Sequence, residues 1–114
     1  MNKENLITWR DFDKMELRVG TIVNATEFKE AINPSFLLTI DFGDFGIRQS
    51  SAQITTLYST SEIIGKQIVA VTNFPKKQIA NKMSECLVLG TLGQENEITL
   101  LSTDKPVKNG IKVG

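Results

Sequence analysis

Short stretches rich in β-branched and other apolar residues, separated by turn-forming residues, run through most of the chain. This arrangement is typical of strands in small all-β domains. It predicts strands over residues 17–28, 36–42, 47–50, 67–72, 86–91 and 97–102. Gly20 lies inside the first stretch, where a glycine often marks a bulge or a tight bend. Residues 29–35 and 73–85 are expected to be loops, and the second of them is polar and basic.

Two short segments predict helices instead. Thr8 can cap the first, with Asp11 three residues later, and apolar residues then recur at helical spacing as far as residue 15. A helix this short is not stable alone, so its apolar face must dock on something. Ser50 can cap the second, with Gln53 at the reciprocal position, and Gly65 ends the connection.

The order of these elements is three strands, a short helix, and then two or more strands. It describes an OB-fold, a partly open Greek-key barrel, although other small β-barrels fit nearly as well. We therefore expect an all-β chain: a five-stranded OB-fold Greek-key barrel with a short N-terminal helix, a short helix between strands 3 and 4, and a C-terminal extension. Residues 1–114 form a single domain, with 1–15 as the helical extension and 103–114 as the C-terminal extension.

The composition argues against catalysis. The chain has no histidine, which removes the commonest general base near neutral pH and the commonest metal ligand. It has one cysteine and no glycine-rich phosphate loop, so neither a usual zinc site nor a nucleotide-binding motif is present. Asp41 and Asp44 flank Gly43 in an expected hairpin turn, where aspartate is common. We expect no enzyme activity and no cofactor or metal.

Charge and hydropathy indicate where the protein is located and which partners suit it. No apolar run approaches the roughly 20 residues of a membrane span, and the N-terminus does not resemble a signal peptide. The lone cysteine favours a reducing, cytoplasmic location. The chain has thirteen basic and thirteen acidic residues, which argues against a protein that coats nucleic acid by bulk charge. Residues 45–84 nevertheless carry five basic residues against one acidic residue, so a positive face is possible, although ordinary solvated lysines would look the same.

Several motifs resemble one known family. Residues 17–22, LRVGTI, look like the D-I/L-R-V-G-x-I opening of the tRNA-binding domain. Residues 47–54, IRQSSAQI, are similar to the I-K-Q-S-S-A-Q-I of the CsaA branch, and residues 71–80, VTNFPKKQIA, to its V-x-N-F-P-x-K/R-x-I-A. Residues 84–90, SECLVLG, and 106–110, PVKNG, match further motifs of that branch. The resemblance covers nearly the whole chain. It implies a homodimeric OB-fold without catalysis, whose relatives bind tRNA or, in the CsaA branch, unfolded polypeptide as an export-related chaperone.

OB-folds bind ligands on the face of strands two and three, framed by the loops between strands 1 and 2 and between strands 4 and 5. Lysines for phosphates beside an aromatic ring for base stacking suit RNA, and the same pairing suits a flexible peptide. Phe74 has an alternative role as a core residue, and Lys76 and Lys77 as plain solvated residues. The candidate RNA- or peptide-binding residues are Arg48, Gln49, Ser50, Asn73, Phe74, Lys76, Lys77, Lys82 and Ser84.

The two extensions lie outside a five-stranded barrel, yet they carry apolar side chains that need burial. We expect these at the interface of a two-fold homodimer; the alternative is that both segments fold back on their own barrel. The expected interface residues are Trp9, Phe12, Val107, Ile111 and Val113.

We therefore expect a non-catalytic, cytoplasmic tRNA-binding protein that binds tRNA, unfolded or precursor polypeptides, or both, in a basic, partly apolar groove, with no membrane insertion. The alternative is an export-related chaperone with little tRNA binding. The basic second loop favours tRNA, but it lacks the K-P-x-K-M-R-G of appended tRNA-binding domains, with Asn81 where a glycine is usual. The acid-rich first loop slightly favours the chaperone. A purely structural subunit has no positive feature.

Overall fold

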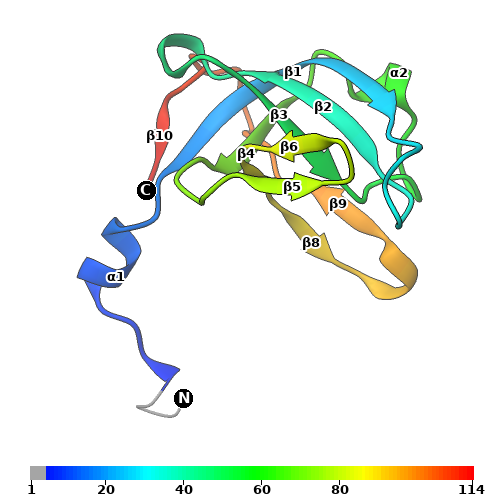
Figure 1. Cartoon of the computed structure of the whole chain (residues 1–114). Helices are drawn as coiled ribbons and strands as arrows, with labels where there is room; N and C mark the ends of the chain where they lie inside the picture. The colour runs from blue at the N-terminus through cyan, green and yellow to red at the C-terminus, as the bar shows by residue number, and fades with distance from the viewer. Residues whose placement is uncertain (1–4) are drawn as a thin grey trace.

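A computed structural model describes residues 5–114, and the body of the molecule is built around one curved antiparallel sheet (Figure 1). The strand order is β3-β2-β1-β4-β7, and β10 also pairs with β1. The strands of this sheet are β1 (Leu17–Glu27), β2 (Phe36–Asp41), β3 (Ile47–Ala52), β4 (Gln67–Val71), β7 (Leu87–Val88) and β10 (Lys112–Val113). The expectation of an all-β, OB-fold-like barrel is confirmed.

The barrel curves because β1 is long enough to serve two partners. Its first half, from Leu17 to Thr21, pairs with β4, and its second half, from Thr21 to Glu27, pairs with β2. Alternate residues of β2 point inward, and Leu38 and Ile40 are fully buried between the walls of the barrel. This period-two burial is what a strand with one face on the core requires.

The two edges of the sheet meet where β3 forms hydrogen bonds with the segment before β7. The Glu85 amide donates to the Gln49 carbonyl at 2.8 Å, and the Ser51 amide donates to Ser84 Oγ at 3.1 Å. Between them, the buried hydroxyl of Ser50 donates to the Cys86 carbonyl at 2.9 Å. These bonds nearly close the barrel and satisfy polar groups that would otherwise be costly to bury.

Gly20 does not mark the bulge of β1, contrary to the sequence-based expectation. The register shifts two residues later, between Ile22 and Asn24. Gly20 is needed because a Cβ there would lie 2.6 Å from Ile40 Cγ2 and 2.8 Å from the Phe42 ring. The glycine allows β1 to approach the core closely, which is another recognised use of glycine in a strand.

The helix expected after Ser50 is also misplaced. β3 continues to Ala52, which pairs with Phe36, and the helix α2 (Thr60–Ile63) begins eight residues later than Ala52. Its cap is Ser59, whose amide donates to Glu62 in a capping box. The predicted helix between strands 3 and 4 therefore exists, but at a different place.

Two short hairpins are added to the sheet. Residues 73–85, expected to be a loop, contain β5 (Lys77–Ile79) and β6 (Lys82–Ser84), joined by a turn in which Ala80 has a φ of 50°. Residues 90–100 form β8 (Gly90–Leu92) and β9 (Ile98–Leu100), joined by a 3₁₀ turn at Gln94–Asn96. A similar 3₁₀ turn, Gly43–Phe45, joins β2 to β3.

The two extensions behave differently. The helix α1 (Trp9–Asp13) forms with Thr8 as its cap and a capping box to Asp11, as expected, but it projects away from the barrel (Figure 1). The C-terminal tail instead folds back on its own barrel, where β10 pairs with the start of β1. Within the described residues, Trp9 of α1 is 87% exposed, whereas Phe12 is half-buried.

Candidate nucleic-acid interface

A groove of about 1110 Å³ lies on one side of the barrel. One wall is the β1–β2 loop, with residues 30–33 and 35, and the floor includes Ser51 and Gln53 at the end of β3. The other wall consists of residues 74–80, with Ser84, Cys86 and Leu87 below it. The two loops that frame the ligand site of an OB-fold therefore line this concavity, whereas of β2 and β3 only Ser51 does.

Four of the nine candidate residues line this groove: Phe74, Lys76, Lys77 and Ser84. Phe74 is 53% exposed, so the alternative of a core residue does not hold. Lys76 Nζ lies 3.4 Å from Glu85 Oε2, and Lys77 is placed opposite Ser84 across the β5–β6 hairpin. The groove thus combines an exposed aromatic ring with two lysines.

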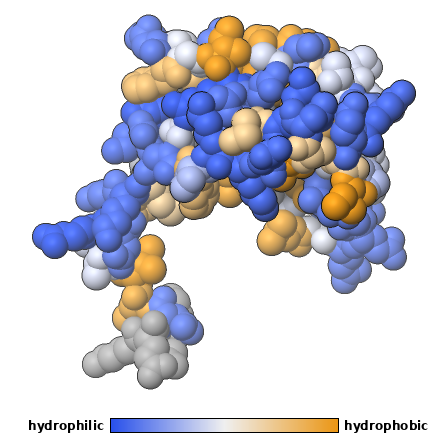
Figure 2. Space-filling view, in the orientation of Figure 1, coloured by the Kyte–Doolittle hydropathy of each residue, from blue (hydrophilic) through white to orange (hydrophobic). Residues whose placement is uncertain are grey.

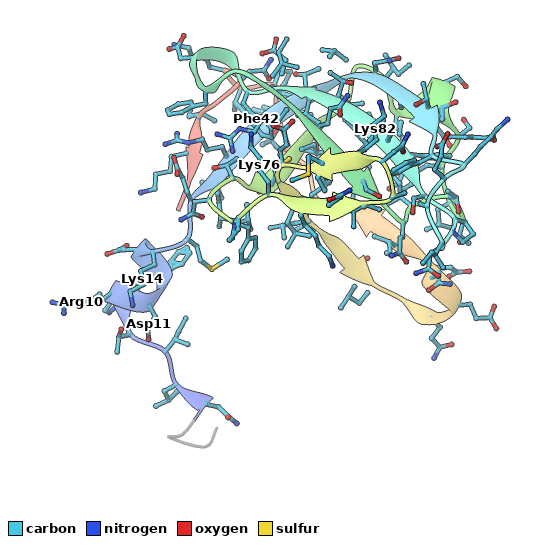
Figure 3. The ribbon with its side chains drawn as sticks, in the orientation of Figure 1. Arg10, Asp11, Lys14, Phe42, Lys76 and Lys82 are labelled. Carbon is cyan, nitrogen blue, oxygen red and sulfur yellow. The ribbon has the colours of Figure 1, made fainter. Side chains whose placement is uncertain are left out.

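Lys82 lies at the far end of the same hairpin, opposite Ile79, and is not among the groove residues. Lys76 and Lys82 sit at opposite ends of the hairpin on the side of the molecule seen in Figure 3. Figure 2 shows that this side is mostly hydrophilic, with apolar patches along the top and right of the barrel and on the N-terminal arm. The positive charges of Lys76 and Lys82 are therefore separated by the length of the β5–β6 hairpin.

Arg48 and Gln49 lie beside the groove but are held in place by the barrel. Arg48 Nη1 donates to the Thr72 carbonyl at 2.6 Å. Glu85 links Gln49 to Lys76, because its Oε1 accepts from the Gln49 amide at 2.9 Å while its Oε2 faces Lys76 Nζ. Glu85 therefore brings the backbone of β3 at Gln49 close to Lys76, although neither Arg48 nor Gln49 lines the groove.

Ser50 and Asn73 have structural roles in this arrangement. Ser50 is 1% exposed and its hydroxyl is bonded inside the barrel, so its side chain does not line the groove. Asn73 Nδ2 donates to the Lys14 carbonyl at 2.6 Å, and its Oδ1 accepts from the Glu16 amide at 2.9 Å. Asn73 thus ties the N-terminal arm to the barrel immediately beside Phe74.

The sequence interpretation expected a partly apolar groove but did not identify two of its apolar residues. Ile32 at the tip of the β1–β2 loop is fully exposed, and Leu87 is 49% exposed. Ile32 lies in the expected loop 29–35, and Leu87 lies just after the expected loop 73–85. A single apolar residue in such a place has no periodic pattern that would predict whether it is exposed. Their exposure is evident only when the strands on either side are in place.

Cys86 borders the groove but is unsuited to reaction. It is 7% exposed, and burial raises the pKa of its thiol to about 11. The thiol is therefore protonated near neutral pH, and the protonated form is a poor nucleophile.

Within residues 5–114, no cluster of three or more potential metal-ligating side chains is found. None of the helices in that part of the chain has the length and apolar character needed to cross a membrane. Every buried side-chain nitrogen and oxygen in the same residues has a hydrogen-bond partner. The groove is thus the feature of this surface that most resembles a binding site.

Comparison with known proteins shows which family this chain belongs to. The family model for a putative tRNA binding domain matches residues 17–112. The chain belongs to this family of tRNA-binding domains.

The crystal structure of the chaperone CsaA from Bacillus anthracis is 46% identical in sequence, with a TM-score of 0.92, and the match covers 96% of this chain and 99% of that one. The CsaA chaperone protein from Picrophilus torridus is 47% identical, with a TM-score of 0.88 and coverage of 96% and 100%. Within the family, the chain is of the CsaA type.

The curated relatives are larger proteins. The methionine–tRNA ligase of Bdellovibrio bacteriovorus is 32% identical over 107 residues, which is 94% of this chain but 15% of the ligase. The chain therefore spans about 15% of the length of the curated relatives it matches. A related structure from Pyrococcus horikoshii, described as a MetRS related protein, is 22% identical with a TM-score of 0.86 and shares the fold.

Proposed function

We propose that this chain is a non-catalytic, cytoplasmic RNA-binding protein that holds tRNA in the groove between the β1–β2 loop and the β5–β6 hairpin. The observation that carries the proposal is the exposed ring of Phe74 beside Lys76 and Lys77 on the ligand-binding face of a tRNA-binding domain. An aromatic ring can stack on an unpaired base while neighbouring lysines contact the phosphates.

The charge distribution sets the strength of this interaction. The net charge of the chain is zero, and Glu85 partly neutralises Lys76. RNA affinity of this kind depends on releasing counterions from a few phosphates, so it falls as salt is raised. We expect modest tRNA affinity that weakens steeply with salt concentration.

Reversing both groove lysines tests the proposal. The double variant K76E/K77E should bind tRNA about tenfold more weakly at low salt, and the slope of log affinity against log salt should be shallower by about 1 to 2, because each lost phosphate contact removes roughly 0.7 to 0.9 from the slope. Mobility-shift titrations at several salt concentrations measure both quantities. Both lysines are exposed, so folding should be unaffected.

A matched control separates the groove from overall charge. K14E/K112E changes the net charge by the same amount at two exposed lysines that do not line the groove. It should retain most of the wild-type affinity and slope. Wild-type binding by K76E/K77E, or equal losses in both double variants, would count against a tRNA site in this groove.

A second candidate function is the binding of unfolded or precursor polypeptide, in line with the chaperones to which the chain is similar. The exposed apolar side chains of Ile32, Phe74 and Leu87 favour it, because an apolar groove with a charged rim accepts peptide side chains. Competition between tRNA and an unfolded polypeptide for the purified protein, at two salt concentrations, distinguishes the candidates. Displacement of one by the other indicates a shared groove.

We also propose that the protein works as a homodimer. The N-terminal arm exposes Leu6, Ile7 and Trp9, with Trp9 87% exposed, and such a row of apolar side chains is rarely left in water. A second copy is the expected cover, because two-fold dimers are the commonest homo-oligomers. Of the expected interface residues in the tail, Ile111 is 46% exposed, while Val107 and Val113 are half-buried against the barrel.

A further inference from the structure

The groove continues on the far side of the β1–β2 loop. Ala31, Ile32 and Ser35 line both the groove and a second hollow of about 620 Å³. Tyr58 in turn lines this second hollow and a third one of about 380 Å³ beside the start of β4. The three hollows therefore lie in series, with the β1–β2 loop between the first two and Tyr58 between the last two, and a ligand that spans them follows a path past both.

The third hollow is a built feature of the fold rather than a gap beside a loose tail. Gln67 holds the tail on both sides of residues 103–106. Its side chain exchanges two hydrogen bonds with the backbone of Val107, from Nε2 to the carbonyl at 2.7 Å and from the amide to Oε1 at 3.0 Å. The Gln67 carbonyl accepts a hydrogen bond from Ser102 Oγ at 2.6 Å. Lys105 is therefore fixed beside the same hollow as Lys66, the residue that precedes Gln67.

Lys66 and Lys105 are the cations of this hollow, and both are exposed. Within residues 5–114, neither lies within 4.0 Å of a carboxylate, although Asp104 also borders the hollow. Lys76, in contrast, shares Glu85. Tyr58 Oη accepts a hydrogen bond from the Leu100 amide at 3.0 Å, which leaves its own proton available for donation. Unpaired ammonium groups beside a hydroxyl donor are the usual partners of a phosphate oxygen.

We infer that Lys66 and Lys105 form a second phosphate subsite, on which the RNA strand held in the groove continues after it passes Tyr58. The inference rests on the proposed function and extends it, because the ligand must then be long enough to span all three hollows. An RNA strand fits this path better than a polypeptide does, since the cations at its end have a phosphate to bind at each nucleotide. A small barrel of this kind typically engages roughly 4 to 16 nucleotides, which allows a path longer than one groove.

The experiment compares two RNA lengths across three double variants. Wild type, K66E/K105E, K76E/K77E and the control K14E/K112E are titrated with whole tRNA and with a single-stranded oligonucleotide of about four nucleotides, the short end of the usual range. K66E/K105E should bind tRNA about tenfold more weakly at low salt, with a salt slope shallower by about 1 to 2. It should bind the oligonucleotide as wild type does, whereas K76E/K77E should bind both ligands more weakly. Thermal melting verifies that all variants are folded.

Each alternative outcome is decisive. If K66E/K105E binds tRNA as wild type does while K76E/K77E is weakened, the second subsite is wrong and the proposed function stands. If wild type has no measurable affinity for tRNA, both fail. Equal losses in K66E/K105E and in the control K14E/K112E would reduce the effect to general charge and overturn the subsite. The subsite is likewise overturned if K66E/K105E weakens binding of an unfolded polypeptide but not of tRNA.

Discussion

Arg18 connects three parts of the chain that are distant in sequence. Its guanidinium donates to Glu16 at 2.8 Å and to the Gly110 carbonyl at 2.9 Å, and it lies 3.6 Å above the ring of Phe45. The side chain is 14% exposed, so these partners occupy most of its surface. The arginine of the LRVGTI motif therefore fastens the tail and the β2–β3 turn to β1, and it is not a free cation for RNA.

The other residue-scale constraint in that motif is Gly20, and it gives a direct prediction. G20A places a methyl group against Ile40 and Phe42, both fully buried, and one overpacked methyl in a tight core costs about 1–3 kcal/mol. Urea unfolding should show a lower midpoint with an unchanged m-value. G114A is the matched control, since a Cβ at Gly114 meets nothing within 4 Å. Equal stability of G20A and wild type would show that β1 can shift away from the core.

The candidate site could be predicted from the sequence only where residue type alone decides a role. An aromatic ring followed by two lysines between strands pointed correctly to the groove wall at Phe74, Lys76 and Lys77. Ser50 was grouped with them because it lies on the expected third strand beside Arg48 and Gln49, and Asn73 because it begins the expected loop. Their partners, the Cys86 and Lys14 carbonyls, lie 36 and 59 residues away, and no local pattern shows such pairings.

At the scale of elements, the strand order could be predicted, but two local assignments were wrong. The pattern of Ser50 and Gln53 suits a helix cap, yet Ala52 pairs with Phe36, and this tertiary pairing outweighs a weak helical preference. The β5–β6 hairpin was missed because its strands are short and mostly polar, and its turn uses Ala80 and Asn81 rather than a glycine. Pairing of the tail with β1 is equally invisible locally, since it joins residues 17 and 113.

The linker between α1 and β1 is held to the barrel in part by the side chain of Asn73. N73A removes the two hydrogen bonds that Asn73 makes with residues 14–16, together about 1–2 kcal/mol of local stability. Trypsin should then cleave after Lys14 about 5- to 30-fold faster, because cleavage follows the population of the locally opened form. Mass spectrometry of timed digests measures this rate. N24A, at an exposed position of β1, is the control and should be cleaved at the wild-type rate. No acceleration in N73A would mean that the contacts of Thr72 with Glu16 suffice to hold the linker.

At the scale of the whole molecule, the chain consists of a barrel with its own buried core and an N-terminal arm without one. The barrel buries its core and closes its own sheet with the help of the tail. The arm presents Leu6, Ile7 and Trp9 to solvent on and before a helix of five residues, too short to be stable without a surface to pack on. Trp9 is the only tryptophan of the chain, so its fluorescence reports on the arm alone.

Dimer formation through the arm predicts how this fluorescence depends on protein concentration. As a dilute monomer, the protein should emit at the long wavelength of a solvated indole, and the emission should shift to shorter wavelength as Trp9 becomes buried between copies. Light scattering on the same samples should show the mass rising from about one to two chains over the same concentration range, because burial and association are one process. I7E, which places a charge in the apolar row of the arm and leaves the barrel untouched, should suppress both changes. A doubled mass with Trp9 still solvated would place the dimer interface elsewhere, on the barrel rather than on the arm.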